Sequence, residues 1–195
     1  MKSTFVAAIV ALSPGLAEAQ DWSGAYGALG SANVSGYEEW FRNGVPSGTW
    51  GNEGRLTSLA IGYNLQDGGV VYGAELGYST GKITFAGLLP DNYLDGMVDL
   101  KARIGFATGK VLFYGTLGWA STDRYFAGPV TNDPISTSGI SYGLGIDVMV
   151  NDRMFVGLEA QQRNLSNDRG DIGGSPNESF DYTVRTVGLR VGFKF

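Results

Sequence analysis

The residues of this chain that are able to do chemistry are carboxylates and basic side chains placed at every second position. Asp99, Lys101 and Arg103 form one such run, and Glu75 and Glu159 stand in segments with the same spacing. Two facing carboxylates can act as general acid and base, as in glycoside hydrolysis. The 195 residues include no histidine and no cysteine, however, so the commonest general base and the thiolate metal ligand are both missing. We therefore interpret these charges as ion pairs and expect a non-enzymatic protein without a cofactor.

Acidic residues in the polar stretches offer a second kind of chemistry, the binding of divalent cations. Asp168 and Asp171 are the closest pair. The pair lacks the ligand number and fixed spacing of an EF-hand loop, which favours a solvated surface and no metal site. The net charge of −5 also argues against a nucleic-acid partner, because proteins that bind nucleic acid carry basic patches.

The segments that carry these charges alternate between apolar and polar residues, and a period of two predicts β-strands. In residues 137–150, for example, Leu144 and Ile146 share one face while Gly145 and Asp147 share the other. Glycine is abundant, with 31 residues, and opposes helix formation. About eight segments of about ten residues follow the pattern, which is the length that a tilted strand needs to cross a bilayer. The segments are residues 22–33, 56–65, 70–80, 98–107, 111–121, 137–150, 154–164 and 187–195.

The connections between these segments alternate between short and long. Turn-forming residues fill 66–69, 108–110 and 151–153, whereas 34–53, 81–95, 122–136 and 165–180 are long polar stretches that we expect to be loops. Barrels of the outer membrane have short turns at one end and long loops at the other. The predicted fold class is therefore all-β, an eight-stranded antiparallel up-and-down transmembrane β-barrel that forms one domain over residues 20–195.

The polar face of the strands is expected to line the lumen, because it combines small residues with charges of both signs. The lumen of an eight-stranded barrel is just wide enough for side chains, so glycines would make room for large charged groups. Charges in such a space must pair, and the apolar face would then contact lipid. The predicted lumen ion-pair network consists of Glu75, Asp99, Lys101, Arg103, Asp147, Glu159, Arg163, Arg190 and Lys194.

Aromatic residues suggest two further features. Interfacial girdles are predicted from the aromatic residues near strand ends, which are Trp22, Tyr26, Tyr63, Tyr72, Tyr78, Trp119, Tyr142, Phe193 and Phe195. External loop contacts are predicted for the aromatic residues of the first long stretch, which are Tyr37, Trp40, Phe41 and Trp50.

Residues 1–19 have the features of a secretory signal peptide. Lys2 precedes an apolar stretch at 5–12, and Ala17-Glu18-Ala19 provides a small-x-small site. We expect cleavage after Ala19 and export to the cell outer membrane.

The C-terminal residues resemble those of a known family. Val187, Leu189, Val191, Phe193 and Phe195 form an alternating apolar ladder that ends in phenylalanine. The ladder resembles the C-terminal assembly signal of small eight-stranded outer-membrane β-barrels, the OmpA-like and opacity-type porin-like families, and residues 22–27 resemble their first strand. The resemblance implies a Gram-negative envelope, both termini in the periplasm, recognition by the barrel-assembly machinery, and contact with outer-membrane lipid and lipopolysaccharide. No peptidoglycan-binding domain is expected.

Together these features predict an integral outer-membrane barrel. Its ion pairs would plug the lumen, and four external loops would make surface contacts and support envelope integrity. Two alternatives remain open at this point: a small pore for ions or solutes, and a soluble periplasmic barrel that binds a small apolar ligand.

Overall fold

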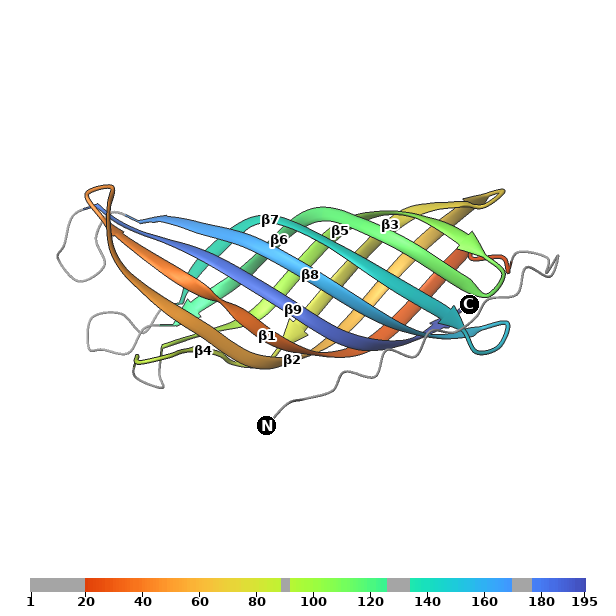
Figure 1. Ribbon diagram of the computed structural model, residues 1–195, viewed down its shortest axis with the longest axis horizontal. Coiled ribbons are helices and arrows are strands. Elements are labelled where there is room, and N and C mark those ends of the chain that lie inside the picture. The colour runs from red at the N-terminus through yellow and green to blue at the C-terminus, as the bar shows by residue number, and fades with distance from the viewer. Residues whose placement is uncertain (1–19, 89–91, 126–133, 170–176) are drawn as a thin grey trace, which may run out of the picture.

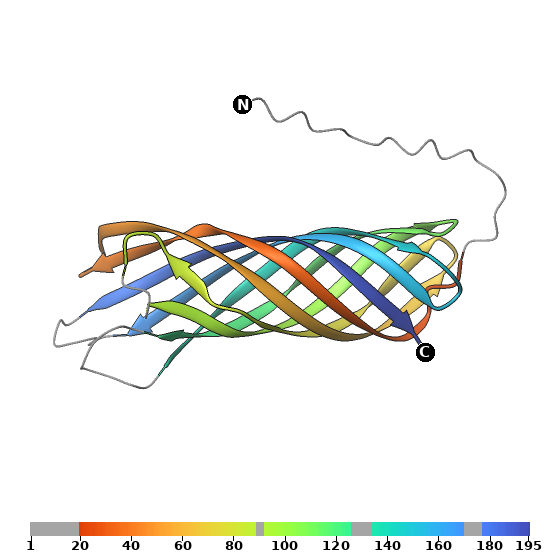
Figure 2. The same cartoon turned by 90° about the horizontal axis from the view of Figure 1, so that it is seen from below.

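Eight long strands close into one antiparallel barrel, seen from two sides in Figures 1 and 2. The computed structural model describes residues 20–88, 92–125, 134–169 and 177–195. Neighbouring strands follow the order β1-β9-β8-β7-β6-β5-β3-β2, and pairing of β2 with β1 closes the ring, while the short β4 pairs with β2 and β5. The predicted fold class is confirmed. The strands are β1 (Gly24–Arg42), β2 (Val45–Asp67), β3 (Val70–Thr80), β4 (Ile83–Phe85), β5 (Tyr93–Thr108), β6 (Val111–Tyr125), β7 (Ile135–Met149), β8 (Met154–Arg169) and β9 (Glu178–Lys194).

The β2–β3, β5–β6 and β7–β8 turns gather at one end of the barrel, which we call the turn end. The opposite end, which also holds the two-residue turn between β1 and β2, is the loop end. The backbone N–H of Gln20 donates to the carbonyl of Gly109 in the β5–β6 turn, at 3.1 Å. The N–H of Phe195 donates to the carbonyl of Ala25 at 3.0 Å. Both ends of the described chain therefore lie at the turn end, and Figure 2 shows the C-terminus there beside the start of β1.

The prediction of a long loop at 34–53 is wrong. β1 continues to Arg42 and β2 begins at Val45, and the tight turn between them passes through Asn43 and Gly44 at φ 52° and 73°. Positive φ at two central residues matches the twist of a two-residue hairpin. The alternation of inward and outward side chains continues through these extensions, but most of the outward residues there are polar.

The outer wall of the barrel is apolar between its two ends. On β7, Leu144 is 72% exposed, whereas Asp147 is 0% exposed on the inner side. This orientation is the inverse of a water-soluble barrel and follows from the strict alternation of side chains along each strand. We call the strand portions that carry these outward apolar residues the spanning zone. They include Leu29, Leu59, Ile61, Leu76, Leu100, Ile104, Leu117, Trp119, Ile140, Leu158, Leu189 and Val191.

No helix long and apolar enough to cross a membrane occurs within the described part of the chain.

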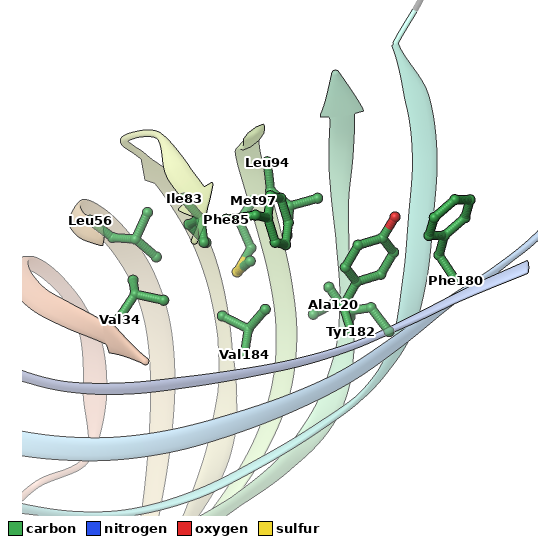
Figure 3. Close-up of a cluster of buried hydrophobic side chains, with 11 residues drawn as sticks. Val34, Leu56, Ile83, Phe85, Leu94, Met97, Ala120, Phe180, Tyr182 and Val184 are labelled. Carbon is green, nitrogen blue, oxygen red and sulfur yellow. The ribbon is translucent and has the colours of Figure 1, made fainter. Parts of the chain in front are cut away.

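Two buried apolar clusters fill the interior near the two ends. The turn-end cluster consists of Trp22, Tyr26, Ala28, Val71, Ala107, Leu112, Tyr114, Met149 and Phe155. The loop-end cluster consists of Val34, Leu56, Ile83, Phe85, Leu94, Met97, Ala120, Leu165, Phe180, Tyr182 and Val184. Figure 3 shows side chains of the loop-end cluster converging within the curve of the strands. The polar part of the interior lies between these clusters.

Candidate functional site

The middle of the lumen is occupied by charged side chains that pair across the barrel. Lys101 of β5 places its Nζ 2.8 Å from Glu75 of β3 and 3.0 Å from Glu159 of β8. Arg190 of β9 places NH1 2.9 Å from the other oxygen of Glu75 and 3.3 Å from Glu159. Two cations and two carboxylates from four strands therefore form a closed set of contacts.

A second group of contacts joins this set toward the turn end. Arg103 makes a very short ion pair with Asp147, and Arg190 Nε lies 3.6 Å from the other oxygen of Asp147. Two tyrosine hydroxyls complete the carboxylate contacts, because Tyr26 donates to Glu75 at 2.8 Å and Tyr114 donates to Glu159 at 3.0 Å. The guanidinium of Arg103 also lies 3.6 Å from the centre of the Tyr114 ring, a cation–π contact.

Asp99 and Arg163 form the part of the network nearest the loop end. Arg163 donates through Nε to Oδ1 of Asp99 at 2.9 Å and through NH2 to Oδ2 at 2.8 Å. This two-point geometry fixes both side chains better than a single contact does. The remaining NH1 donates to Thr186 at 3.2 Å, and the Gln161 side chain accepts a short bond from NH2.

Glycines on the inner face leave the room that these side chains occupy. A Cβ at Gly62 would overlap the Tyr26 ring, and a Cβ at Gly145 would overlap the Tyr114 ring. At Gly157 the added atom would collide with Asp147. The abundance of glycine on the polar face of the strands is therefore a steric requirement of a filled lumen.

Eight of the nine residues predicted for the lumen network are brought together, four acids with four bases. Lys194 lies apart from them and is corrected here: its Nζ contacts the carbonyl of Asp21 and is 4.0 Å from the Asp21 carboxylate, which is 69% exposed. The physical reason is position, because Lys194 is the last residue of β9 and lies at the rim of the turn end.

A cavity of about 70 Å³ adjoins the network on its β1–β2 side. Its lining includes small residues, among them Gly30, Ser58 and Ala60, and charged residues, among them Lys101 and Asp99. A polar space of this size can hold a few water molecules.

A further buried ion pair lies at the loop end and was missed by the sequence analysis. Arg124 NH2 is 3.1 Å from Glu38 Oε2, and both side chains are 1% exposed. The Arg124 guanidinium also lies 4.2 Å from the Phe85 ring centre. Burial raises the pKa of the Glu38 carboxyl, although the charge of Arg124 opposes the shift, and burial also raises the pKa of the Tyr182 hydroxyl beside them. The available signal was the continued alternation into 34–42 and 122–125, which places both residues on inward positions.

The four aromatic residues predicted to make external loop contacts lie in strands and divide between two faces. Trp40 and Trp50 pack inward against the loop-end cluster, with ring centres 6.2 Å apart. Tyr37 and Phe41 alternate with Trp40 on β1 and lie on the outer side, where the Arg185 guanidinium is 5.9 Å from the Tyr37 ring.

The predicted interfacial girdle is also corrected, because Trp22 and Tyr26 are buried in the turn-end cluster.

The C-terminal ladder lies entirely on the outer face. Its members are exposed on β9 and at the chain end: Val187, Leu189, Val191, Phe193 and Phe195. Their role in assembly stays a prediction.

Within the described ranges, no group of three or more histidine, cysteine, aspartate or glutamate residues is placed to hold a metal ion. Asp171, the side chain of Asp168 and the predicted signal peptide at residues 1–19 lie outside what the structure describes.

Comparison with known proteins adds the family. The model for the outer membrane protein beta-barrel domain matches residues 4–195. No curated protein matches the sequence. Among solved structures, OprG from Pseudomonas aeruginosa is 14% identical, with 91% of this chain and 99% of that chain covered and a TM-score of 0.50. Neisserial surface protein A is 14% identical over 89% and 98% of the two chains with a TM-score of 0.46, and Ail from Yersinia pestis is 12% identical over 86% and 99% with a TM-score of 0.45.

Proposed function

The chain belongs to the outer membrane protein beta-barrel domain family, which places it in the outer membrane, and from this premise we propose that it is a non-enzymatic barrel with a closed lumen. In this proposal the protein supports the envelope and presents its loop end for surface contacts. The lipid-facing band anchors the barrel. The ion pairs and the two apolar clusters block passage through it.

One observation carries the proposal: the lumen network is neutral and is bounded along the barrel axis by apolar clusters. Its four acids match its four bases, and each of these charges contacts a partner of opposite sign. A hydrated ion entering this space would have to displace a charged partner or cross the buried side chains of a cluster, and both steps are costly.

Planar-bilayer recording with the purified protein tests the closed lumen. We expect no discrete conductance steps from the wild type. The double variant Asp99→Ala/Arg163→Ala removes a paired cross-lumen contact and should introduce steps. The matched control Arg42→Ala/Glu178→Ala removes an ion pair of 2.9 Å at the loop end, where Arg42 is 50% exposed, and should stay silent. Discrete steps from the wild type would instead establish the alternative of a small pore for ions or solutes.

A soluble periplasmic barrel is not favoured. Such a barrel would bury its apolar face, whereas Leu144 and Leu189 are 72% and 69% exposed. Retention with outer membranes and heat-modifiable migration in a denaturing gel are the expected behaviour.

For assembly, we propose that the C-terminal ladder engages the barrel-assembly machinery. The ladder is outward-facing and ends at Phe195, which contacts Phe193 edge to face with ring centres 5.7 Å apart. Deletion of Phe195 should reduce the amount of folded barrel in the outer membrane far more than the amount secreted to the periplasm. Equal membrane assembly with and without Phe195 would reject this role.

A further inference from the structure

The segment that precedes β1 crosses the mouth of the barrel at the turn end. Residues 20–23 belong to no strand, and Figure 1 shows them in red at that end; we call them the strap. In the ring of strands β6 stands four positions from β1 in either direction, so the β5–β6 turn lies across the mouth from β1. The backbone N–H of Gln20 donates to the carbonyl of Gly109 in that turn at 3.1 Å. The strap therefore reaches from the start of β1 to the far side of the ring.

Trp22 is the residue of the strap that enters the barrel. It is 2% exposed, whereas Asp21 is exposed and Ser23 is half-buried. The Trp22 ring centre lies 5.9 Å from the ring centre of Phe155, the second residue of β8. The strap thus places one large aromatic ring in the mouth and leaves the neighbours of that ring nearer the surface.

The apolar residues that share the turn-end cluster with Trp22 lie at the ends of their strands. Inward side chains at such positions would face water in an open barrel mouth, and exposing them would be unfavourable. Each of four such residues is nevertheless at most 3% exposed, and these are Val71, Ala107, Leu112 and Met149. Trp22 lies on the mouth side of this layer, because it precedes the first residue of β1. Its ring is therefore placed to keep water from the layer.

Single bonds hold the strap, and no β-ladder does. The N–H of Trp22 donates to Oε1 of Gln66 at 2.8 Å, and Oγ of Ser23 accepts from the N–H of Gln66 at 3.1 Å. The Lys194 ammonium contacts the carbonyl of Asp21. Nε1 of Trp22 is buried and has no hydrogen-bond partner among the described residues. It would regain water on leaving the mouth, which lowers the cost of opening. The strap can therefore detach while every strand pair stays intact.

The loop end is closed in a different way. Within the described ranges its apolar cluster consists of strand residues alone, from Val34 on β1 to Val184 on β9. Opening that end requires strands to move or distort, and strands are held by continuous backbone pairing. The two ends of the lumen therefore differ in how easily they can open.

We propose that the strap is a detachable closure of the turn end, with Trp22 as its stopper. The inference rests on the proposed closed lumen and identifies the end at which that lumen opens without unfolding. Detachment exposes the turn-end cluster to solvent and leaves the loop-end cluster covered.

Thiol labelling tests the closure, because the chain has no cysteine of its own. Ala107→Cys places a thiol in the turn-end cluster, and Ala120→Cys places a matched thiol in the loop-end cluster; the two alanines are 3% and 0% exposed. Each variant is held in lipid nanodiscs, which leave both ends of the barrel accessible, and is reacted with a charged methanethiosulfonate. Mass spectrometry gives the labelling rate, and heat-modifiable migration verifies that the barrel is folded.

We expect both thiols to be labelled slowly while Trp22 is present. Trp22→Ala should raise the labelling rate of the Ala107→Cys variant about tenfold or more and leave that of the Ala120→Cys variant unchanged, because only the opening of the turn end becomes more populated. Trp22→Phe keeps an aromatic stopper and should stay within about threefold of the parent rate.

Equal labelling of the Ala107→Cys variant with and without Trp22→Ala would overturn the inference. An equal rise at both thiols would also overturn it, because the whole barrel would then have loosened. So would rapid labelling of the Ala107→Cys variant beneath an intact strap. Rapid labelling of the Ala120→Cys variant with the strap intact would instead reject the closed lumen itself, so the two proposals fail in distinguishable ways.

Discussion

The spanning zone and the loop end differ in the polarity of the residues that one strand places on the same face. On β9 the inward residues are Arg190 and Thr186 in the spanning zone, but Val184 and Tyr182 at the loop end. The outward residues change from Leu189 to polar ones beyond Val187. On β9 the alternation of side chains does not shift across this boundary, although the polarity of the two faces is exchanged.

The difference teaches that strand geometry and polarity pattern are set independently. Backbone pairing fixes which side chains point inward, and the medium outside the wall decides which residue types belong there. Where lipid surrounds the barrel, an apolar interior gains nothing over an apolar exterior, and paired charges can fill the lumen. Where water surrounds it, burial of apolar side chains is again the main stabilising force. The loop end is therefore built like a small soluble barrel standing on a membrane barrel.

The largest expected effect follows from removing one partner of a buried lumen pair. Asp147→Asn leaves Arg103 buried without its counter-charge and should lower the free energy of unfolding by about 3–5 kcal/mol. At the loop-end rim, Glu178→Gln should lower it by less than about 1 kcal/mol, because Arg42 is half exposed and solvated. Urea unfolding in lipid vesicles measures both. Equal losses would show that the two zones do not differ in how they hold charge.

A smaller effect is expected from placing a charge on the outer face of each zone. Leu144→Arg puts a cation against lipid and should cost about 2–4 kcal/mol. Ser136→Arg lies on the same face of the same strand, eight residues away at the loop end, and should change stability by no more than about 0.5 kcal/mol. Folded yield in vesicles, followed by unfolding titrations, separates the two. A costly Ser136 variant would mean that lipid reaches farther up β7 than the polarity change indicates.

Truncation of a leucine should have the opposite order of effects, with a larger loss of stability at the loop end than in the spanning zone. Leu165→Ala opens a cavity in the loop-end cluster, where Leu165 is 1% exposed, and should cost about 2 kcal/mol or slightly more. Leu117→Ala on the lipid face, where the residue is 58% exposed, should cost about 1 kcal/mol or less, because lipid fills the space. Hydrogen exchange of β8 and β6 amides localises each effect. A larger loss at Leu117 would contradict a loop end held by apolar packing.

Much of the barrel was predictable because side-chain alternation is a geometric property. The assignment of Leu144 outward and of Asp147 inward needed only the period of two and the argument that glycines and charges share a narrow lumen. The pairing of Asp99 with Arg163 could not be read in the same way, since it depends on the register that brings β5 and β8 to the same height. Sequence supplied the face of each residue but not its height in the barrel.

The errors have the same physical origin. Residues 34–53 were expected to be a loop because the stretch is long and polar and lacks the apolar outward face of the spanning zone. Glu38 and Arg124 were missed for that reason, although each continues the inward series of its strand. Lys194 also stands in the inward series of its strand, but it is the last residue of β9 and lies at the rim. Its position along the barrel axis therefore keeps it out of the lumen network.

The smallest effect is expected at the turn-end rim, where neither lipid nor a buried core acts on the charges. The pKa of Asp21 is lowered from 3.8, chiefly because the backbone N–H of Ser23 donates to its carboxylate at 2.8 Å. A lowered pKa in the folded state gives stability that is present above pH 3.8 and is lost as the pH falls through the folded value. The carboxylate is largely exposed, so solvent screening limits the effect of Asp21→Asn to about 0.5 kcal/mol or less at neutral pH. Unfolding titrations of both proteins from neutral pH down to well below the pKa should show the difference shrinking as the wild-type carboxylate is protonated. A difference that does not shrink in acid would mean that the Ser23 contact does not lower the pKa of Asp21 in the folded state.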